Sequence, residues 1–248
     1  MQNIILTLIP QSGEPLNTNM STMFHGLLME FADSEYAGLM HRQGLKPYSQ
    51  YICRGKNKKE WHWHIKTLTD EAFNKLAAPL FHGTADCLEL KKKNIALKIK
   101  KKELGERLTV EDLVQKFYIN GNANRRIKIR FITPCAFKTS GRYEFFPHIP
   151  LIYQSLMNKF DCFSESVSVK DNDALRHLCE NTRITDYRLK SSRFNLEGIK
   201  IPSFLGEIIF RIEGPETLVN LANLLIYYGL WAGLGIKTTL GMGGIDVE

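Results

Sequence analysis

Several features that would assign this chain to a familiar class are absent from its sequence. No apolar run approaches the roughly 20 residues that cross a membrane, and residues 1–15 have neither a basic lead nor a long apolar region. No signal peptide is therefore predicted, and no membrane is expected as a partner. The five cysteines are odd in number, widely spread and without a C-x-x-C pair: Cys53, Cys87, Cys135, Cys162 and Cys179. We expect reduced thiols and a cytoplasmic location.

Metal-dependent chemistry also has little support in the sequence. No group of acidic residues resembles the facing carboxylates of a two-metal nuclease. His62 and His64 alternate along a strand and share one face, but no third ligand is evident beside them. Zinc needs three or four ligands, so a zinc enzyme built on this pair is a remote alternative. We predict no metal site and no cofactor.

What the sequence does contain is clustered positive charge. Its 248 residues are 44% hydrophobic and 24% charged, as in a soluble protein of one large or two small domains. Lys and Arg number 33 against 26 Asp and Glu, a net charge of +7. The excess is concentrated in four runs: residues 56–59, 91–93, 98–102 and 125–130. One such run is typical of a solvated strand, but four favour a nucleic-acid partner.

A glycine-rich segment closes the chain between residues 229 and 248. Glycines accompany one lysine and two hydroxyls, and the predicted RNA-binding residues are Gly233, Gly235, Lys237, Thr238, Thr239, Gly241 and Gly243. Glycine lets backbone amides approach a ligand closely, and the lysine suggests phosphate. In mononucleotide-binding motifs the glycines follow a strand and open a helix. Here a helix precedes them, so the backbone of an extended nucleic acid is the better candidate ligand.

Hydrophobic periodicity predicts the elements of the first half. Their order is strand, helix, hairpin, helix, strand: residues 3–10, a turn at 12–15, then 21–40, 51–54 with 61–66, 69–80 and 95–99. The second half repeats this order: residues 127–133, 147–160, a short helix at 173–179, strands 188–203 and 205–213 joined near Pro202, a helix closed by Gly229, and a last strand. We predict an α+β protein of two tandem ferredoxin-like (βαββαβ, RRM-like) domains, residues 1–123 and 124–248.

His41 is the strongest candidate for acid–base chemistry among the seven histidines. It stands where the first helix is predicted to end, beside Arg42 and five residues before Lys46. An imidazole there can deprotonate a ribose 2′-hydroxyl while the ammonium stabilises a phosphorane. The alternative is a histidine favoured at a helix C-terminus by the helix dipole. His25, within the helix, is more typical of a packed residue.

Five segments together resemble a known family along nearly the whole chain. They are FHGLLMEF at residues 24–31, MHRQGLKPY at 40–48, TPCAFKTSGRYEFFP at 133–147, DYRLKSSRFNLEGIKIPSFLGEI at 186–208 and GLGIKTTLGMGG at 233–244. The chain resembles the CRISPR-associated endoribonucleases that cut repeat RNA into guide RNAs, in the variety that accompanies type III systems.

The resemblance implies a function as well as the fold. It implies metal-independent cleavage within each repeat, leaving a 5′-hydroxyl and a 2′,3′-cyclic phosphate, with His41 and Lys46 as catalytic residues. A tyrosine used by some members falls here at about Met29, which cannot transfer a proton. His25, Tyr36 and Tyr48 remain alternatives for the second proton-transfer group, as does His41 acting nearly alone.

RNA binding is expected on a basic hairpin at residues 188–200. By resemblance, Arg188, Lys190 and Arg193 contact the RNA, whose phosphates fix position while base edges set specificity. The expected partner is CRISPR repeat RNA; a type III effector complex that receives the guide RNA and a second copy of the chain remain open. The alternative function is a non-catalytic RNA-binding subunit of the same superfamily, which would need no titratable group at His41.

Overall fold

The computed structural model describes residues 1–11, 15–42, 44–196 and 198–248. Their contacts form two compact units, Met1–Arg107 with Thr238–Gly241, and Leu108–Lys237 with Met242–Glu248. The division falls earlier than the predicted boundary after residue 123. The reason is a helical segment that the sequence analysis missed, α5 (Val110–Val114) with η4 (Gln115–Ile119). It packs on α8 (Glu216–Ala232), where the Phe117 and Tyr227 ring centroids lie 4.9 Å apart.

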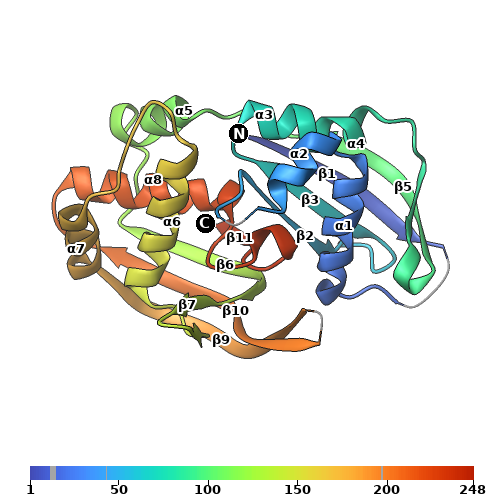
Figure 1. Ribbon diagram of the computed structural model, residues 1–248. Coiled ribbons are helices and arrows are strands. Elements are labelled where there is room, and N and C mark those ends of the chain that lie inside the picture. Colours follow the sequence, from blue (N-terminus) through green and yellow to red (C-terminus); the bar gives the residue numbers. More distant parts are fainter. Residues whose placement is uncertain (12–14, 43, 197) are drawn as a thin grey trace. The chain divides into compact units, whose positions relative to one another are not determined.

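The first unit is built on a five-stranded antiparallel sheet of order β2-β3-β1-β5-β4 (Figure 1). The strands are β1 (Gln2–Pro10), β2 (Tyr48–Arg54), β3 (Trp61–Thr67), β4 (Cys87–Leu90) and β5 (Ile95–Leu104). The helical elements are η1 (Thr18–Met20), α1 (Ser21–Phe31), α2 (Ser34–Met40), α3 (Asp70–Ala72), η2 (Phe73–Ala77), α4 (Ala78–His82) and η3 (Lys91–Lys93). Without β4, a short edge strand that the sequence analysis missed, the order is the predicted ferredoxin-like one.

Alternation along β2 and β3 decides which side chains face the helices of this unit. Ile52 and Trp63 are fully buried in the hydrophobic core with residues of α1. The rings of Phe24 on α1 and Trp63 meet edge to face at 5.0 Å. Since successive residues of a strand point to opposite faces, His62 and His64 lie on the face away from α1.

The single helix predicted for residues 21–40 is wrong, because two helices occupy this stretch. Ala32 has extended backbone dihedrals and ends α1. Asp33 then caps α2 by accepting a hydrogen bond from the Tyr36 amide at 3.0 Å, as N-cap aspartates do. Apolar residues keep helical spacing through the break, so periodicity alone did not show it. His41 consequently ends the second helix rather than the first.

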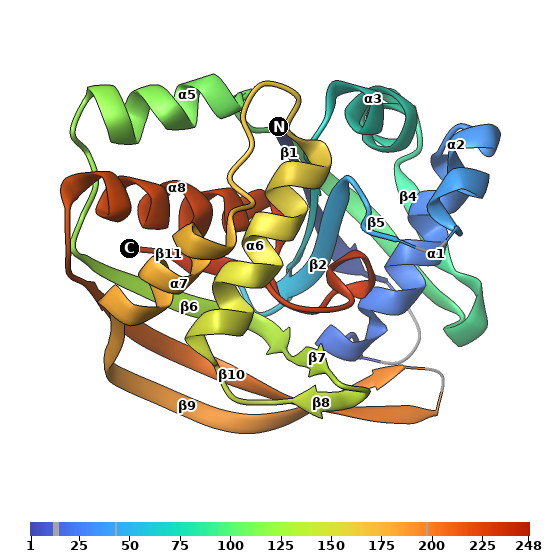
Figure 2. The same cartoon turned by 60° about the vertical axis from the view of Figure 1, so that its left-hand side comes forward.

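The second unit has the predicted ferredoxin-like order without additions in its main sheet, β11-β6-β10-β9. These strands are β6 (Arg126–Cys135), β9 (Thr182–Leu196), β10 (Ile199–Ile212) and β11 (Ile245–Val247), all with antiparallel neighbours. The remaining elements are α6 (Ile149–Phe163), α7 (Asn172–Asn181), η5 (Thr238–Leu240, in the first unit) and the hairpin β7 (Phe137–Thr139) with β8 (Arg142–Glu144). Helices α6 and α8 cover one face of the sheet (Figure 2). The rings of Phe160 and Tyr228 join these helices at 5.1 Å.

Two boundaries in this unit differ from the prediction. Strand β9 ends at Leu196 and β10 begins at Ile199, so Pro202 sits inside β10 and not at the junction of the two strands. There β10 pairs only with β9, because its pairing with β6 starts at Phe204, so the missing proline amide costs no ladder bond. Gly229 is internal to α8, which ends at Ala232, and Gly233 caps it with a φ of 65°. The short hairpin of β7 and β8 was not predicted.

Residues 12–14 of the turn predicted at 12–15, and residue Gln43 of the predicted helix end, lie outside the described residues. Among the helices of the described segments, none is long and apolar enough to cross a membrane.

Candidate active site

His41 lies at the C-terminal cap of α2, with its side chain exposed. Its amide donates to the carbonyl oxygen of Gly38 at 3.3 Å, which closes the last turn of the helix. Lys46 folds back onto the same helix end. Its ammonium donates to the carbonyl oxygens of Leu39, at 3.4 Å, and Arg42. The loop therefore brings the two predicted catalytic residues to one helix terminus, where a cation also complements the helix dipole.

His25 reaches the same place from α1. The ring centroids of His25 and His41 are 6.4 Å apart and the rings are nearly perpendicular. Burial, followed by the proximity of His41, lowers the pKa of His25 to about 4. His25 is accordingly neutral near pH 7, so it can donate one hydrogen bond and accept another. The structure thus brings together all three residues that the sequence analysis proposed for catalysis.

Tyr48 connects His25 to the glycine-rich segment. Its hydroxyl lies 3.0 Å from Nδ1 of His25 and also shares a hydrogen bond with the side chain of Thr239. Burial raises the pKa of Tyr48 well above its ordinary value, so the hydroxyl keeps its proton. Tyr48 was an alternative for the second proton-transfer group, but it is fully buried and engaged with His25. It is better placed to orient His25 than to reach a substrate.

The segment that carries Thr239 is fixed to α1 and β2 by tight packing. Gln50 donates from Nε2 to the carbonyl oxygens of Ser21 and Thr239, both at 2.9 Å, and accepts from the Trp63 indole at 3.0 Å. Gly241 has a φ of 105°, and a Cβ atom there would lie 2.1 Å from the Cβ of Ser21. Only glycine satisfies both conditions. Thr239 and Gly241, predicted to bind RNA, thus have an internal role beside His25.

Tyr36, the remaining alternative for proton transfer, is engaged elsewhere. Tyr36 is buried, hydrogen-bonds to the Thr69 side chain, and has its pKa raised to about 12 by burial and the nearby Glu71 carboxylate. Met29, at the position where some relatives were expected to use tyrosine, packs against the hydrophobic core.

The predicted RNA-gripping hairpin is formed by β9 and β10. Arg188, Lys190 and Arg193 are exposed, and none of them has an acidic partner among the described residues. Gly206 of β10 permits the close pairing of this hairpin, because a Cβ atom there would lie 2.0 Å from the carbonyl oxygen of Arg188. Alternation places Arg188 and Lys190 on one face of β9 and Arg193 on the other, so the three cations do not form one row.

Two of the other basic runs are partly neutralised within the protein. In the run at 125–130, Lys128 pairs with Glu248 at 2.9 Å and Arg130 pairs with Asp246 at 2.5 Å. In the run at 98–102, Lys100 pairs with Glu60 at 2.5 Å, and Lys102 donates to backbone carbonyls of which Gly83 is nearest at 2.7 Å. The net charge therefore overstates the surface available to a polyanion.

The glycine amides of the C-terminal segment are also used internally. Gly233 donates to the Gly229 carbonyl at 2.9 Å, Gly235 to the Ser155 hydroxyl at 3.2 Å, and Gly243 to the Pro134 carbonyl at 2.9 Å. This argues against the expected phosphate cradle of backbone amides. Lys237, with a φ of 56°, is exposed, whereas Thr238 is buried. Lys237 is the member of the segment whose charge faces solvent.

A buried lysine supports this segment from α6. The Lys159 ammonium donates to the carbonyl oxygens of Ala232, Gly233 and Gly235 at 3.2, 2.9 and 3.2 Å. Burial lowers its pKa to about 7. The periodicity of α6 gave no sign of this role, because a lysine at a core-facing position reads as a surface residue until its acceptors are known.

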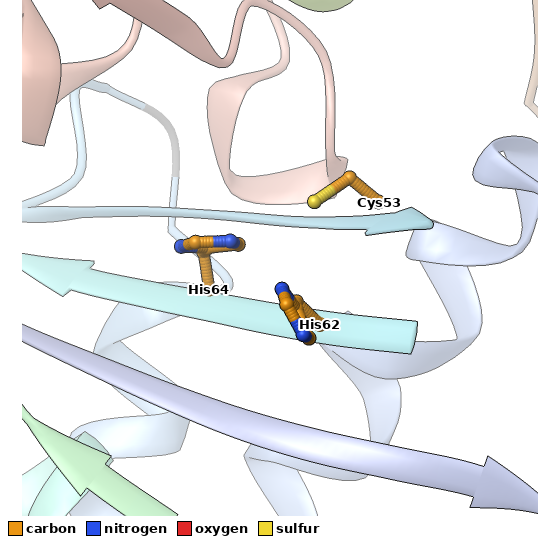
Figure 3. A group of neighbouring side chains, drawn as sticks. All are labelled: Cys53, His62 and His64. Atoms are coloured by element: carbon orange, nitrogen blue, oxygen red, sulfur yellow. The ribbon is translucent and has the colours of Figure 1, made fainter. Parts of the chain in front are cut away.

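The statement that no third ligand lies near His62 and His64 is wrong. Cys53 is the cross-strand partner of His62, and one ligand atom from each of the three side chains lies within 4.8 Å of the others (Figure 3). The register of the β2–β3 hairpin produces this cluster, and register cannot be read from either strand alone.

Solved structures first define the class of fold. A Thermus thermophilus Cas6 product complex superposes with a TM-score of 0.81 at 22% identity, covering 100% of this chain and 99% of that one. The chain thus has the fold of the Cas6 structures, with tandem ferredoxin-like units.

Sequence comparison then identifies the family. The model of the CRISPR-associated endoribonuclease Cas6 family matches residues 129–245. The Streptococcus thermophilus CRISPR-associated endoribonuclease Cas6 is 36% identical over 231 residues, covering 93% of this chain and 92% of that protein. The Mycobacterium tuberculosis protein of the same name is 30% identical over 224 residues, covering 90% of this chain and 70% of that protein. The chain belongs to the Cas6 family of CRISPR-associated endoribonucleases.

Proposed function

We propose that this protein cleaves CRISPR precursor RNA within its repeats by a metal-independent mechanism. The ribose 2′-hydroxyl gives its proton to a base and its oxygen attacks the adjacent phosphorus, so that a 2′-O–P bond forms and the P–O5′ bond breaks. The products are a 2′,3′-cyclic phosphate and a 5′-hydroxyl, whose oxygen takes up a proton. The observation that carries this proposal is the exposed His41 imidazole beside a neutral, hydrogen-bonded His25.

Each member of the site has a distinct role in this mechanism. His41 is exposed and accepts the proton of the ribose 2′-hydroxyl, as general acid–base catalysis requires of a group that reaches the substrate. Lys46 uses two of its three ammonium donors on the end of α2, which leaves one for the charge that develops on the phosphorane. Partial desolvation lowers the pKa of Lys46. The His25 ring lies beside the His41 ring and orients it, and the hydrogen bond from Tyr48 holds His25 in place.

RNA is held in this proposal by exposed cations of the second unit. Arg188, Lys190 and Arg193 of the β9–β10 hairpin, with Lys237, supply phosphate contacts in this proposal. Their lack of acidic partners among the described residues favours them over the paired cations of the other basic runs. We further propose that the protein acts in the cytoplasm and passes its guide RNA to a type III effector complex, as the family resemblance suggests.

One assay tests the reaction and its alternative. The protein is incubated with its cognate repeat RNA in excess EDTA, and the product ends are analysed. We expect cleavage with a 2′,3′-cyclic phosphate, and no cleavage of an otherwise identical RNA with 2′-deoxyribose at the scissile position. RNA that is bound but intact in EDTA and with added Mg²⁺ would instead show a non-catalytic RNA-binding subunit. Cleavage of the deoxy substrate would exclude attack by the 2′-oxygen.

A further inference from the structure

Cys53, His62 and His64 project from neighbouring strands on the sheet face away from α1. Cys53 and His62 are opposed across the β2–β3 pair, and His64 follows two residues along β3. Figure 3 shows Cys53 on one strand and His62 and His64 on the neighbouring strand. Their nearest candidate ligand atoms, one sulfur and two imidazole nitrogens, lie within 4.8 Å of one another. Among the described residues, this is the one group of three metal-ligating side chains with such spacing.

His64 provides a second, independent observation. Its Nδ1 atom is buried, and the described structure gives it no hydrogen-bond partner. A buried polar atom without a partner carries a desolvation cost, and in native proteins such atoms usually have a partner, an ordered water or an ion. The His64 ring stacks on Tyr51 with centroids 4.6 Å apart, which fixes its plane.

We propose that Cys53, His62 and His64 bind one Zn²⁺ ion. One thiolate and two imidazoles form a ligand set that suits zinc, and the fourth position of the tetrahedron is left to water. Ligand atoms around tetrahedral zinc are roughly 3.3–3.6 Å apart, given Zn–N and Zn–S bonds of about 2.0–2.1 and 2.3 Å. Side-chain rotations that move the ligand atoms by about 1 Å therefore close the cluster around the ion without a change in strand register.

The charges around this site and its position on the sheet favour a structural role for the metal. Lys66 follows on the same strand face, with its ammonium 5.2 Å from the Tyr51 ring centroid. Its positive charge repels a metal cation bound nearby. The Cys53 thiolate offsets one charge of the ion. Tyr48 and His25 lie across the sheet, on the side of α1, so the metal is not part of the cleavage site. It cross-links β2 and β3 and stabilises their hairpin.

Metal binding is measured directly on the whole protein after any polyhistidine tag has been removed. The protein is stripped with EDTA, reconstituted with Zn²⁺ and analysed for bound metal, and the affinity is measured by competition with a chromophoric chelator. Co²⁺ is used as a spectroscopic substitute, because a thiolate ligand gives a sulfur-to-cobalt charge-transfer band. We expect one equivalent of zinc, micromolar or tighter affinity, and that band. Substoichiometric zinc, or a preference for copper with no retained zinc, would overturn the proposal.

Matched substitutions locate the site. Cys53→Ser should remove the charge-transfer band, and His64→Gln should weaken zinc binding at least about 100-fold, since loss of even an outer-shell partner costs 10–100-fold. Cys87→Ser and His82→Gln change exposed residues on β4 and at the end of α4 and should leave both readouts unchanged. A band that survives Cys53→Ser would refute the assignment. Because the wild-type titration needs no variant, misfolding of a variant leaves the test intact. RNA cleavage in EDTA is scored separately and stands or falls on its own.

Discussion

The Tyr48 hydroxyl lies 3.0 Å from Nδ1 of His25, and the two rings are within 7° of parallel. Through Thr239 the same hydroxyl is linked to a segment that is distant in sequence. This relationship makes the C-terminal glycine-rich segment part of the support of the candidate active site.

Tyr48→Phe keeps the packing of the ring but removes both hydrogen bonds. We expect a stability loss of about 1 kcal/mol and a several-fold lower cleavage rate with unchanged RNA affinity, because His25 loses its orientation. Single-turnover kinetics and filter binding separate these effects. Tyr36→Phe is the matched control, since it removes a buried hydroxyl that bonds to Thr69 instead. Equal rate losses in the two variants would mean that Tyr48 acts only on stability.

His41→Ala removes the exposed imidazole at the end of α2. We expect cleavage to fall by about 10²–10⁴-fold, the usual contribution of a positioned acid or base, while RNA affinity changes little. His82→Ala provides the comparison, because His82 is also an exposed histidine at a helix end. Cleavage at the wild-type rate by His41→Ala would refute the catalytic assignment.

The stability of the protein should depend on His25 in mild acid. The folded pKa of about 4 lies below the ordinary value of 6.5, so the unfolded chain binds more protons between these values. The contribution of neutral His25 is therefore complete above about pH 6.5 and is lost as the pH falls toward 4. Denaturant unfolding of wild type and His25→Gln across this range should show a smaller pH slope for the variant. His64 contributes in the same direction in both proteins, and identical slopes would contradict the buried, neutral His25.

The stability of the protein should depend on Lys159 in the alkaline range. Because its folded pKa of about 7 lies below the ordinary value of 10.5, the unfolded chain again binds more protons in between, and this residue makes stability rise with pH from 7 to 10.5. Lys159→Met leaves three carbonyl oxygens without their donor and should cost a few kcal/mol at pH 7. The difference in unfolding free energy between wild type and variant should grow with pH. A difference that shrinks with pH would show that Lys159 stays charged throughout.

Lys237→Ala should weaken RNA binding and reduce its dependence on salt. Each lost contact to single-stranded RNA phosphate lowers the slope of log affinity against log salt by about 0.7. Arg188→Ala should behave in the same way. Arg176→Ala serves as the control, because Asp173 at 2.9 Å and Glu180 at 3.7 Å already neutralise that cation. A salt slope equal to that of wild type would remove Lys237 from the RNA contacts.

Local sequence pattern was sufficient for most elements of the fold. Strands β1 and β6 and helix α6 have clear periodicity, and the repeated element order gave the ferredoxin-like arrangement that the structure confirms. The break at Asp33 was hidden because apolar spacing continues across it. Edge strand β4 and the α5 segment were missed because short elements with polar flanks carry little periodicity.

The candidate site shows which neighbours the local spacing of residues can predict and which it cannot. The sequence by itself determined that His41 and Lys46 share one loop, since Lys46 comes only five positions after His41. Tertiary structure alone decided that His25, Tyr48 and Thr239 form one chain of hydrogen bonds, and that Cys53 opposes His62. Those neighbours depend on strand register and on the packing of segments far apart in the chain, and neither leaves a mark in the spacing of residues along one segment.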